Sequence, residues 1–420
     1  MIELKPNTYN NFKCPECTAD IIEIKEVILQ GIHILAECKC SKCGLEFFND
    51  LPIGHGFLYP QIIGKNNLKL YSLDNANFFS QPLINSIASK SKLNVEIIKK
   101  TYFHKDEVII LNCIDYLYGH VLLKLFNSQY YLDNFKDFGL IIIIPKGFEW
   151  LIPDGISELW VVNINLKDTL NWYTQLENFF KNEIQNHKRV LLSAAFSHPD
   201  FTKIDISKFT KIKKFEIDNF KNRALNITFI IRQDRIWTIP MYGYIFRRLE
   251  KFKFVKYYNK LNLLIQNRLI TLLCKEIKKE FPSIIFNVVG FGLFGKFNNT
   301  INDNRVEVIN EIIEKEWCKI YSKSHLVIGV HGSNMIIPTA LSAGFIEILP
   351  DDRLGNILQD IGSPLVKREL LFLCRFVSEF AKPEYIAKIV VSIIKNFESF
   401  QNTMSDEYLD HDNFLKYIKH

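Results

Sequence analysis

The sequence lacks several features that would assign a protein class at once. Its longest apolar runs, such as LIIIIP at 140–145, stop well short of the ~20 residues that a membrane-spanning helix requires. Its first residues, MIELKPNTYNNFKCPEC, show no basic start, apolar core and small-residue cleavage site, so we expect no secretion signal. Short-period repeats and low-complexity tracts are also missing. We therefore expect a protein of a reducing cytoplasm, either free or resting at the inner face of a membrane.

The excess of positively over negatively charged residues is also small. Lys and Arg exceed Asp and Glu by only +6 in 420 residues, and the excess is spread over many segments. Such a chain is compatible with a phosphate-bearing small ligand or an anionic membrane surface, and it does not demand nucleic acid. With 48% hydrophobic and 23% charged residues, it is a globular chain long enough for two domains and a small module.

The cysteines are unevenly distributed. Five of the nine lie close together, in CPEC (14–17) and CKCSKCG (38–44). In a reducing compartment, two C-x-x-C pairs joined by two alternating apolar runs predict a hairpin that holds two metal-binding knuckles. Four thiolates at this spacing suit a tetrahedral, structural Zn²⁺ ion. Cys38 could replace Cys40 as a ligand, and the alternative is free buried cysteines that share this spacing. The predicted ligands are Cys14, Cys17, Cys40 and Cys43.

A linker rich in Gly and Pro at 51–60 is followed by two series of strand-like and helical stretches. This rhythm predicts parallel sheets covered on both faces, and hence an α/β fold of two Rossmann-like, doubly wound domains behind a small zinc ribbon. The predicted strands are 107–113, 139–145, 158–164, 189–196, 227–232, 283–292, 325–330 and 345–350. The predicted helices are 116–132, 168–187, 261–281, 305–324, 335–343 and 383–400. The predicted domains are the ribbon at 1–50, Rossmann-like domains at 51–215 and 216–370, and C-terminal helices at 371–420 that pack back on the body.

A polar loop, HGSN at 331–334, separates two of the predicted strands. Ligands of parallel sheets bind where the carboxyl ends of strands meet helix N-termini. His331 can donate to a phosphate or sugar oxygen, and Gly332 lets the backbone approach closely. Ser333 and Asn334 can cap the next helix while their N–H groups face an anion, which predicts a diphosphate site. The alternative is a plain helix cap beside a buried histidine.

Two other features could complete this site. Arg232 and Arg235 follow the first strand of the second series, and guanidinium groups suit oxyanions, although surface ion pairs with Asp234 or other acids would also explain them. Glu347 lies in the apolar strand FIEILP and needs donors, which backbone or ribose hydroxyls would supply. GFGLFG (290–295) fits G-x-G-x-x-G, but a polar loop rather than a helix follows it, so we expect no nicotinamide or flavin site there.

In the first series, Asp115 and His120 stand at a strand end and early in a helix. Either could remove a proton from a hydroxyl nucleophile. The alternatives are a capping aspartate and a hydrogen-bonded core histidine. The string LDNFKDF at 132–138 does not supply a D-x-D metal motif. Without Mg²⁺, the charge of a leaving diphosphate would be stabilised by arginines and a helix N-terminus.

Three of these stretches together resemble a known family. Arg232-x-x-Arg235 after a strand, GVHGSNM (329–335) and IEILP (346–350) resemble the C-terminal half of GT-B-fold glycosyltransferases, most of all glycosyltransferase family 61, whose loop reads H-G-A-G-L-x-N. DYLYGH is similar to that family's first-domain motif, so the resemblance covers roughly residues 110–360. It implies inverting transfer of a sugar from a nucleotide-sugar donor to a hydroxyl of a glycan, polysaccharide or glycoconjugate, with no catalytic metal.

The resemblance also implies roles for single residues. His120 or Asp115 would lie on the acceptor side, and the acceptor would be a glycan or a glycolipid. The alternative from another class is a zinc-ribbon protein that binds nucleic acid or protein without catalysis. The interleaved basic and aromatic residues that nucleic-acid binding needs occur only in KFKFVKYYNK (251–260). The implied donor-binding residues are Arg232, Arg235, His331, Gly332, Ser333, Asn334 and Glu347.

Overall fold

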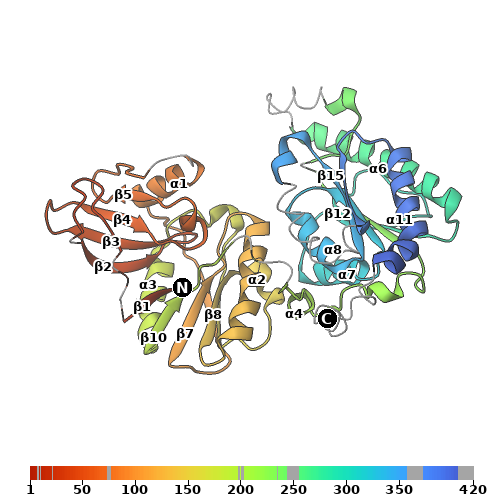
Figure 1. Cartoon of the computed structure of the whole chain (residues 1–420). Helices are drawn as coiled ribbons and strands as arrows, with labels where there is room; N and C mark the ends of the chain where they lie inside the picture. The colour runs from red at the N-terminus through yellow and green to blue at the C-terminus, as the bar shows by residue number, and fades with distance from the viewer. Residues whose placement is uncertain are drawn as a thin grey trace, which may run out of the picture. The chain divides into compact units, whose positions relative to one another are not determined.

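The computed structural model forms two compact units, residues 1–200 (unit 1) and 201–420 (unit 2); in Figure 1 the colour runs from red in unit 1 to blue in unit 2. Each unit has its own sheets and its own apolar core. The predicted domain limits at 50, 215 and 370 remain predictions. The described residues are 1–6, 9, 11–20, 22–72, 77–196, 199, 203–233, 235–243, 255–356 and 372–404.

Unit 1 contains a six-stranded sheet in the order β1-β10-β7-β8-β9-β6. The four central strands are parallel, and the edge strands β1 and β6 run antiparallel to their neighbours. Every residue of β8 and β9 is buried, as expected for central parallel strands. The elements are β1 (Ile2–Lys5), α1 (Asn77–Ala88), β6 (Ile97–Thr101), β7 (Glu107–Asn112), α2 (Tyr118–Asn134), β8 (Gly139–Pro145), β9 (Glu158–Val162), α3 (Thr174–Glu183) and β10 (Arg189–Leu192).

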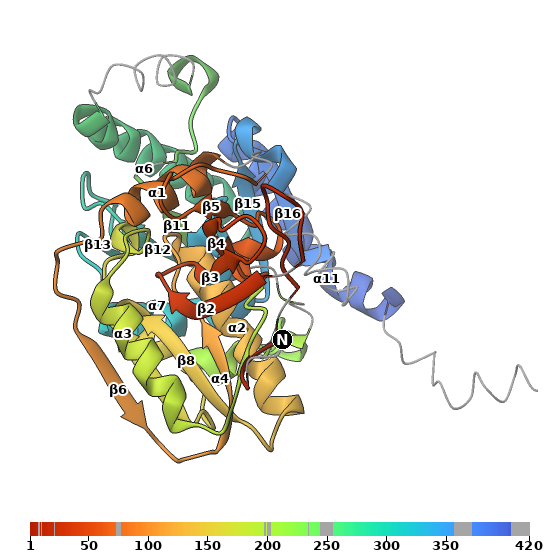
Figure 2. The ribbon, with the colours of Figure 1, turned by 90° about the vertical axis from the view of Figure 1, so that its left-hand side faces the viewer.

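A second, antiparallel sheet in unit 1 carries the cysteine-rich ribbon. Its strand order is β2-β3-β4-β5. These strands follow β1 in the sequence, so the ribbon is inserted after the first strand of the larger sheet. Helix α3 packs against β2, as Figure 2 shows. At the hairpin turn, a Cβ on Gly31 would lie 2.6 Å from the carbonyl oxygen of Thr169, so the turn touches the larger sheet's connections directly. The strands are β2 (Ile22–Leu29), β3 (Ile34–Cys40), β4 (Glu46–Asp50) and β5 (Ile62–Gly64).

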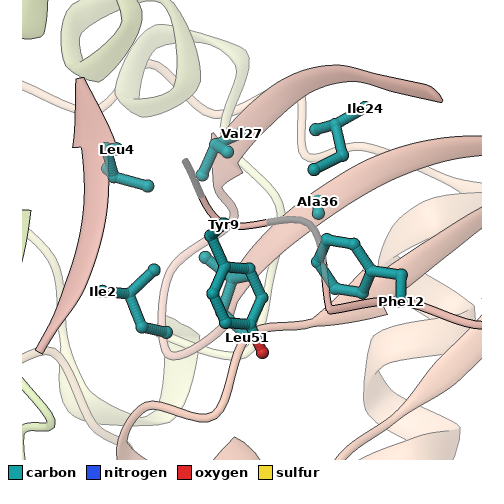
Figure 3. Close-up of a pocket in the computed structure, with 8 residues that line it drawn as sticks. All are labelled: Ile2, Leu4, Tyr9, Phe12, Ile24, Val27, Ala36 and Leu51. Atoms are coloured by element: carbon teal, nitrogen blue, oxygen red, sulfur yellow. The ribbon is translucent and has the colours of Figure 1, made fainter. Parts of the chain in front are cut away.

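Apolar side chains join β1 to the ribbon (Figure 3). The Tyr9 and Phe12 rings meet edge to face, with their centroids 5.1 Å apart. The group leaves no space of the size of a water molecule, so it forms a closed apolar contact within unit 1. Its members are Ile2, Leu4, Tyr9, Phe12, Ile24, Val27, Ala36 and Leu51.

Unit 2 has one fully parallel sheet in the order β13-β12-β11-β14-β15-β16. Counted along unit 2 this is 3-2-1-4-5-6, the strand order of a Rossmann fold. Helix α6 packs against α11, and α7 packs against α8 (Figure 1). The predicted α/β class is thereby confirmed. The elements are α4 (Ser207–Thr210), β11 (Asn226–Ile231), α6 (Val255–Glu280), β12 (Ile285–Phe291), β13 (Asn302–Val306), α7 (Glu311–Tyr321), β14 (Leu326–Val330), α8 (Ile336–Leu341), β15 (Gly344–Leu349), β16 (Cys374–Ser378) and α11 (Pro383–Met404).

The structure differs from the sequence prediction around residue 305. Strand β13 occupies Asn302–Val306, where we predicted a polar loop and a helix start. It is an edge strand that pairs only with β12, so Asn302 and Asp303 can stay exposed, whereas the buried Arg305 side chain pairs with Asp303 at 2.7 Å. Helix α7 begins later, because the Asn310 side chain accepts a hydrogen bond from the Ile313 N–H at 3.0 Å and caps it.

Helix α11 belongs to the core of unit 2. Its buried side chains include Ile386, Val390 and Phe397, and the Phe397 ring lies 4.3 Å from that of Phe220. We predicted only helices at 371–420: in the described part, Pro383–Met404 is helix α11, but Cys374–Ser378 forms the edge strand β16 of the sheet. Among the described residues, no helix combines the length and the apolarity that crossing a bilayer requires.

Candidate functional site

The ribbon brings the four predicted zinc ligands together. Cys14 Sγ lies 3.5 Å from Cys43 Sγ, and Cys17 Sγ lies 3.6 Å from Cys40 Sγ. All four sulphur atoms lie within 4.8 Å of one another. A tetrahedral ion with Zn–S bonds of about 2.3 Å separates its sulphurs by about 3.8 Å. The four thiols therefore fit one zinc ion with little movement.

The backbone turns of the two knuckles set this geometry. The Thr18 N–H donates to the Cys14 carbonyl, and the Gly44 N–H donates to the Cys40 carbonyl, both at 2.9 Å. Thr18 and Gly44 adopt positive φ angles of 58° and 76°, as tight turns require. Cys38 lies apart: its thiol donates to the Ala36 carbonyl at 3.6 Å, and burial raises its pKa to about 12. The geometry thus favours Cys40 over Cys38 as the fourth ligand.

A buried ionic cluster lies at the carboxyl end of β7 in unit 1. Asp115 is fully buried, and its Oδ2 accepts from His55 Nε2 at 2.6 Å and lies 2.9 Å from Lys124 Nζ. Its Oδ1 accepts from the Leu117 N–H at 3.1 Å and lies 3.4 Å from His120 Nδ1. Along the sheet the chain runs from β7 through β8 to β9 on one side of β7, and β10 lies on its other side, so the cluster lies where the strand order reverses.

Burial and neighbouring charges give the members of this cluster different protonation states, and hence different roles. Burial raises the pKa of Asp115, but the Lys124 charge and the hydrogen bonds from His120 and His55 outweigh it and hold the pKa well below the usual range. Burial lowers the pKa of His55 to about 4, so this imidazole is neutral at pH 7. A carboxylate held so firmly in its charged form is a poor proton acceptor. Asp115 is suited to orient the two histidines, and only His120 is partly exposed.

Sequence reasoning missed His55. It lies in the stretch 51–60, which its Gly and Pro content indicated to be a linker. In the structure, residues Gly54–Phe57 form a short 3₁₀ turn, and the Gly54 N–H donates to the Ala194 carbonyl at 2.8 Å, just after β10. A lone histidine between two glycines carries no signal of its own, because its partner Asp115 is 60 residues away along the chain.

His55, Asp115 and His120 also have the composition of a metal site. Their ligand atoms lie within 4.8 Å of one another. However, the Lys124 ammonium is buried against the same carboxylate and also donates to the Ile114 carbonyl at 3.0 Å. A fixed positive charge here opposes a second cation, so the cluster fits a hydrogen-bonded relay better than a metal site.

In unit 2, the predicted donor-binding residues meet at the carboxyl ends of β11 and β14. These neighbouring strands form the switch point of the 3-2-1-4-5-6 sheet. Arg232 Nη1 donates to Asn334 Oδ1 at 2.5 Å, and Arg235 Nη1 donates to the His331 carbonyl at 3.0 Å. Gln266 of α6 donates to the Arg232 carbonyl at 2.9 Å and fixes the loop after β11. Ser333 is partly buried and begins the 3₁₀ turn that leads into α8.

The other polar contacts of the loop are equally specific. His331 Nδ1 lies 2.6 Å from Glu347 Oε2, and both side chains are more than nine-tenths buried. This contact supplies the partner that the buried Glu347 needs, and it fixes the orientation of the His331 ring. The Nδ2 group of Asn334 is buried and has no hydrogen-bond partner among the described residues. A buried amide donor beside two guanidinium groups has the chemistry to contact an anion.

Gly332 allows the two arginines to approach the loop. Its φ of 151° with ψ of −178° lies in a region that only glycine adopts readily. A Cβ here would lie 2.1 Å from Arg232 Nη1 and 2.9 Å from Arg235 Nη1. A side chain at this position would therefore displace both guanidinium groups.

Three features of the sequence fall partly or wholly outside the described residues. Asp234, the alternative partner of the arginines, is one of them. Residues 251–254 of the basic and aromatic run at 251–260 are another, whereas 255–260 lie in α6. A D-x-D string in the tail, Asp410 to Asp412, also lies outside them.

Comparisons with known proteins add little to this geometry. No protein-family model and no curated protein sequence matches the chain. Among solved structures, it is similar to a Listeria monocytogenes protein described as a UDP-N-acetylglucosamine 2-epimerase, with 10% identity and a TM-score of 0.33. The similarity covers 71% of this chain and 90% of that one. The class of the protein, two Rossmann-like units with a ribbon inserted in the first, therefore rests on the strand orders themselves.

Proposed function

We propose that the protein is a glycosyltransferase that moves a sugar from a nucleotide-sugar donor to a hydroxyl acceptor. One observation carries the proposal: at the switch point of unit 2, Arg232 and Arg235 converge on a loop that contains the buried, unpartnered Nδ2 donor of Asn334. The resemblance of this loop to glycosyltransferase family 61 gives the reaction type.

In this proposal the diphosphate of the donor lies against the loop after β14. Arginine guanidinium groups form charge-assisted hydrogen bonds with phosphate oxygens and remain charged as the diphosphate leaves. The Asn334 amide and the N–H groups of Ser333 and Asn334 supply further donors. Glu347 acts through His331 by holding its ring in place. No catalytic metal is needed for this stabilisation.

On the acceptor side we propose His120 as the general base for an inverting transfer. It would remove the proton of the acceptor hydroxyl as the sugar is transferred. Asp115, which sequence alone left as an equal candidate, is instead a positioning residue, because its charge is committed to Lys124 and the two histidines. The zinc ion of the ribbon would be structural.

The test measures nucleotide binding by isothermal titration calorimetry with UDP, GDP, CMP and ADP. We expect saturable binding of one nucleotide, weakened about tenfold or more in Arg232→Ala and in His331→Ala. Arg268→Ala, which removes an exposed arginine of α6, is the matched control and should bind as the wild type does. Circular dichroism checks that each variant is folded.

Two results would count against the proposal. If no nucleotide binds to the wild type, the donor site is wrong. If Arg232→Ala and Arg268→Ala bind equally well, the guanidinium group of Arg232 does not contact the ligand, and the assignment of the loop fails with it.

A further inference from the structure

Unit 2 exposes apolar side chains where the first described turns of α6 meet the loop after β12. Leu261 and Leu264 of α6 are 42% and 43% exposed, and Leu293 and Phe294 of the loop are 50% and 41% exposed. A Cβ on Gly295 would lie 3.0 Å from Leu264 Cδ2, so the helix and the loop are in contact. These four side chains, which we name the α6–β12 surface, form one patch.

Basic residues surround this patch. Lys260 Nζ lies 5.4 Å from the centre of the Phe294 ring. Arg268 is exposed on α6, one turn after Leu264. Lys296 is exposed in the loop, directly after Gly295. The sequence has no Asp or Glu from 260 to 275 or from 291 to 302. The surface therefore combines large apolar side chains with positive charge and has no acidic residue in these two segments.

We propose that the α6–β12 surface docks unit 2 on an anionic lipid bilayer. Leucine and phenylalanine side chains would enter the boundary between head groups and acyl chains, while the lysines and the arginine contact anionic head groups. The surface lies at the carboxyl end of β12, the strand next to β11. Docking would thus hold the nucleotide loop of unit 2 near the membrane, although the inference does not depend on sugar transfer.

Charge and residue type select this occupant over two others. A second copy of the chain would bring Lys260, Arg268 and Lys296 against the same charges, which repel. Single-stranded nucleic acid would be held by stacking on aromatic rings, and three of the four apolar side chains are leucines, which cannot stack. A bilayer uses both the leucines and the positive charge.

The test is co-flotation of the full-length protein with vesicles of phosphatidylcholine, with and without phosphatidylglycerol. We expect binding only to the anionic vesicles and a steep loss of binding at high salt. Leu264→Glu and Leu293→Glu should each weaken binding about tenfold or more, and Lys260→Ala about fivefold. Ile285→Glu is the control, because Ile285 is 40% exposed at the opposite end of β12.

Several results would overturn the proposal. They are absence of binding to anionic vesicles, equal binding to neutral vesicles, or an effect of Ile285→Glu as large as that of Leu264→Glu. Binding of single-stranded DNA that Leu264→Glu abolishes would assign the surface to nucleic acid instead. Dimerisation in sedimentation velocity that Leu264→Glu abolishes would assign it to a second copy. Nucleotide titrations of the same variants show whether the donor site is intact, so a failure of membrane docking can be told apart from a failure of the proposed donor site.

Discussion

Replacing Gly332 by alanine tests the nucleotide loop most directly. The new Cβ would lie 2.1 Å from Arg232 Nη1, and ordinary contact begins near 3.4 Å, so the guanidinium group must move by about 1.3 Å. Arg235 Nη1, at 2.9 Å, must move by about 0.5 Å. The first shift is large enough to break the hydrogen bond from Arg232 to Asn334 Oδ1.

Two effects of different size follow. The backbone of an alanine here adopts a conformation that costs about 1–3 kcal/mol, which lowers the free energy of unfolding by that amount. A lost charge-assisted hydrogen bond to a phosphate is worth about 1.5–3 kcal/mol, so nucleotide affinity should fall about tenfold to a hundredfold. Because arginine side chains are flexible, the clash itself adds little to the loss of stability.

The assay is calorimetric titration with the nucleotide that the wild type binds, together with urea unfolding of each variant. Gly355→Ala is the matched control, because a Cβ at Gly355 meets nothing within 4 Å. It should leave affinity unchanged. A folded Gly332→Ala protein with wild-type affinity would refute the reasoning, since the two arginines would then have moved without consequence for the ligand.

Three further predictions concern unit 1. Elemental analysis should find about one zinc per chain, lost in Cys14→Ser and retained in Cys38→Ser; a folded, metal-free wild type would contradict the ribbon assignment. Because the pKa of His55 falls from 6.5 to about 4 on folding, the unfolded chain binds more protons in that window. The free energy of unfolding should therefore drop by up to about 3 kcal/mol as pH falls from 6.5 to 4, and a slope unchanged in His55→Asn would disprove this. Asp115→Asn leaves the Lys124 charge buried without its counter-ion and should cost about 3–5 kcal/mol in urea unfolding, against almost nothing for the exposed Asp137→Asn.

The central strands could be predicted from sequence because their environment leaves a strong signal. Strands β8 and β14 are buried along their whole length, so they appear as continuous apolar runs such as GLIIIIP and LVIGV. The four edge strands of the two large sheets, β1, β6, β13 and β16, were all missed. An edge strand has one partner and can keep polar side chains in water, so NDNRV in β13 shows no apolar pattern.

The candidate sites were predictable to the extent that their residues are close along the chain. The C-x-x-C pairs and HGSN can be recognised because their residues are close together in the sequence. The contacts of His331 with Glu347 and of Arg232 with Asn334 join strands that are neighbours in the sheet, so strand order was needed to find them. His55 had no signal at all, because only tertiary packing brings it to Asp115.

The place of the ribbon in the chain limits how it can be removed. Strand β1 precedes the ribbon but pairs with β10, so the ribbon is tethered to the larger sheet at both of its ends. Shortening the protein from its amino terminus would strip an edge from that sheet before it reached the first cysteine. Excision of β2 to β5 from within the chain would also remove His55, which lies between β4 and β5 and contacts Asp115. An engineered protein without the module would therefore need a replacement connection that restores both the strand and the histidine.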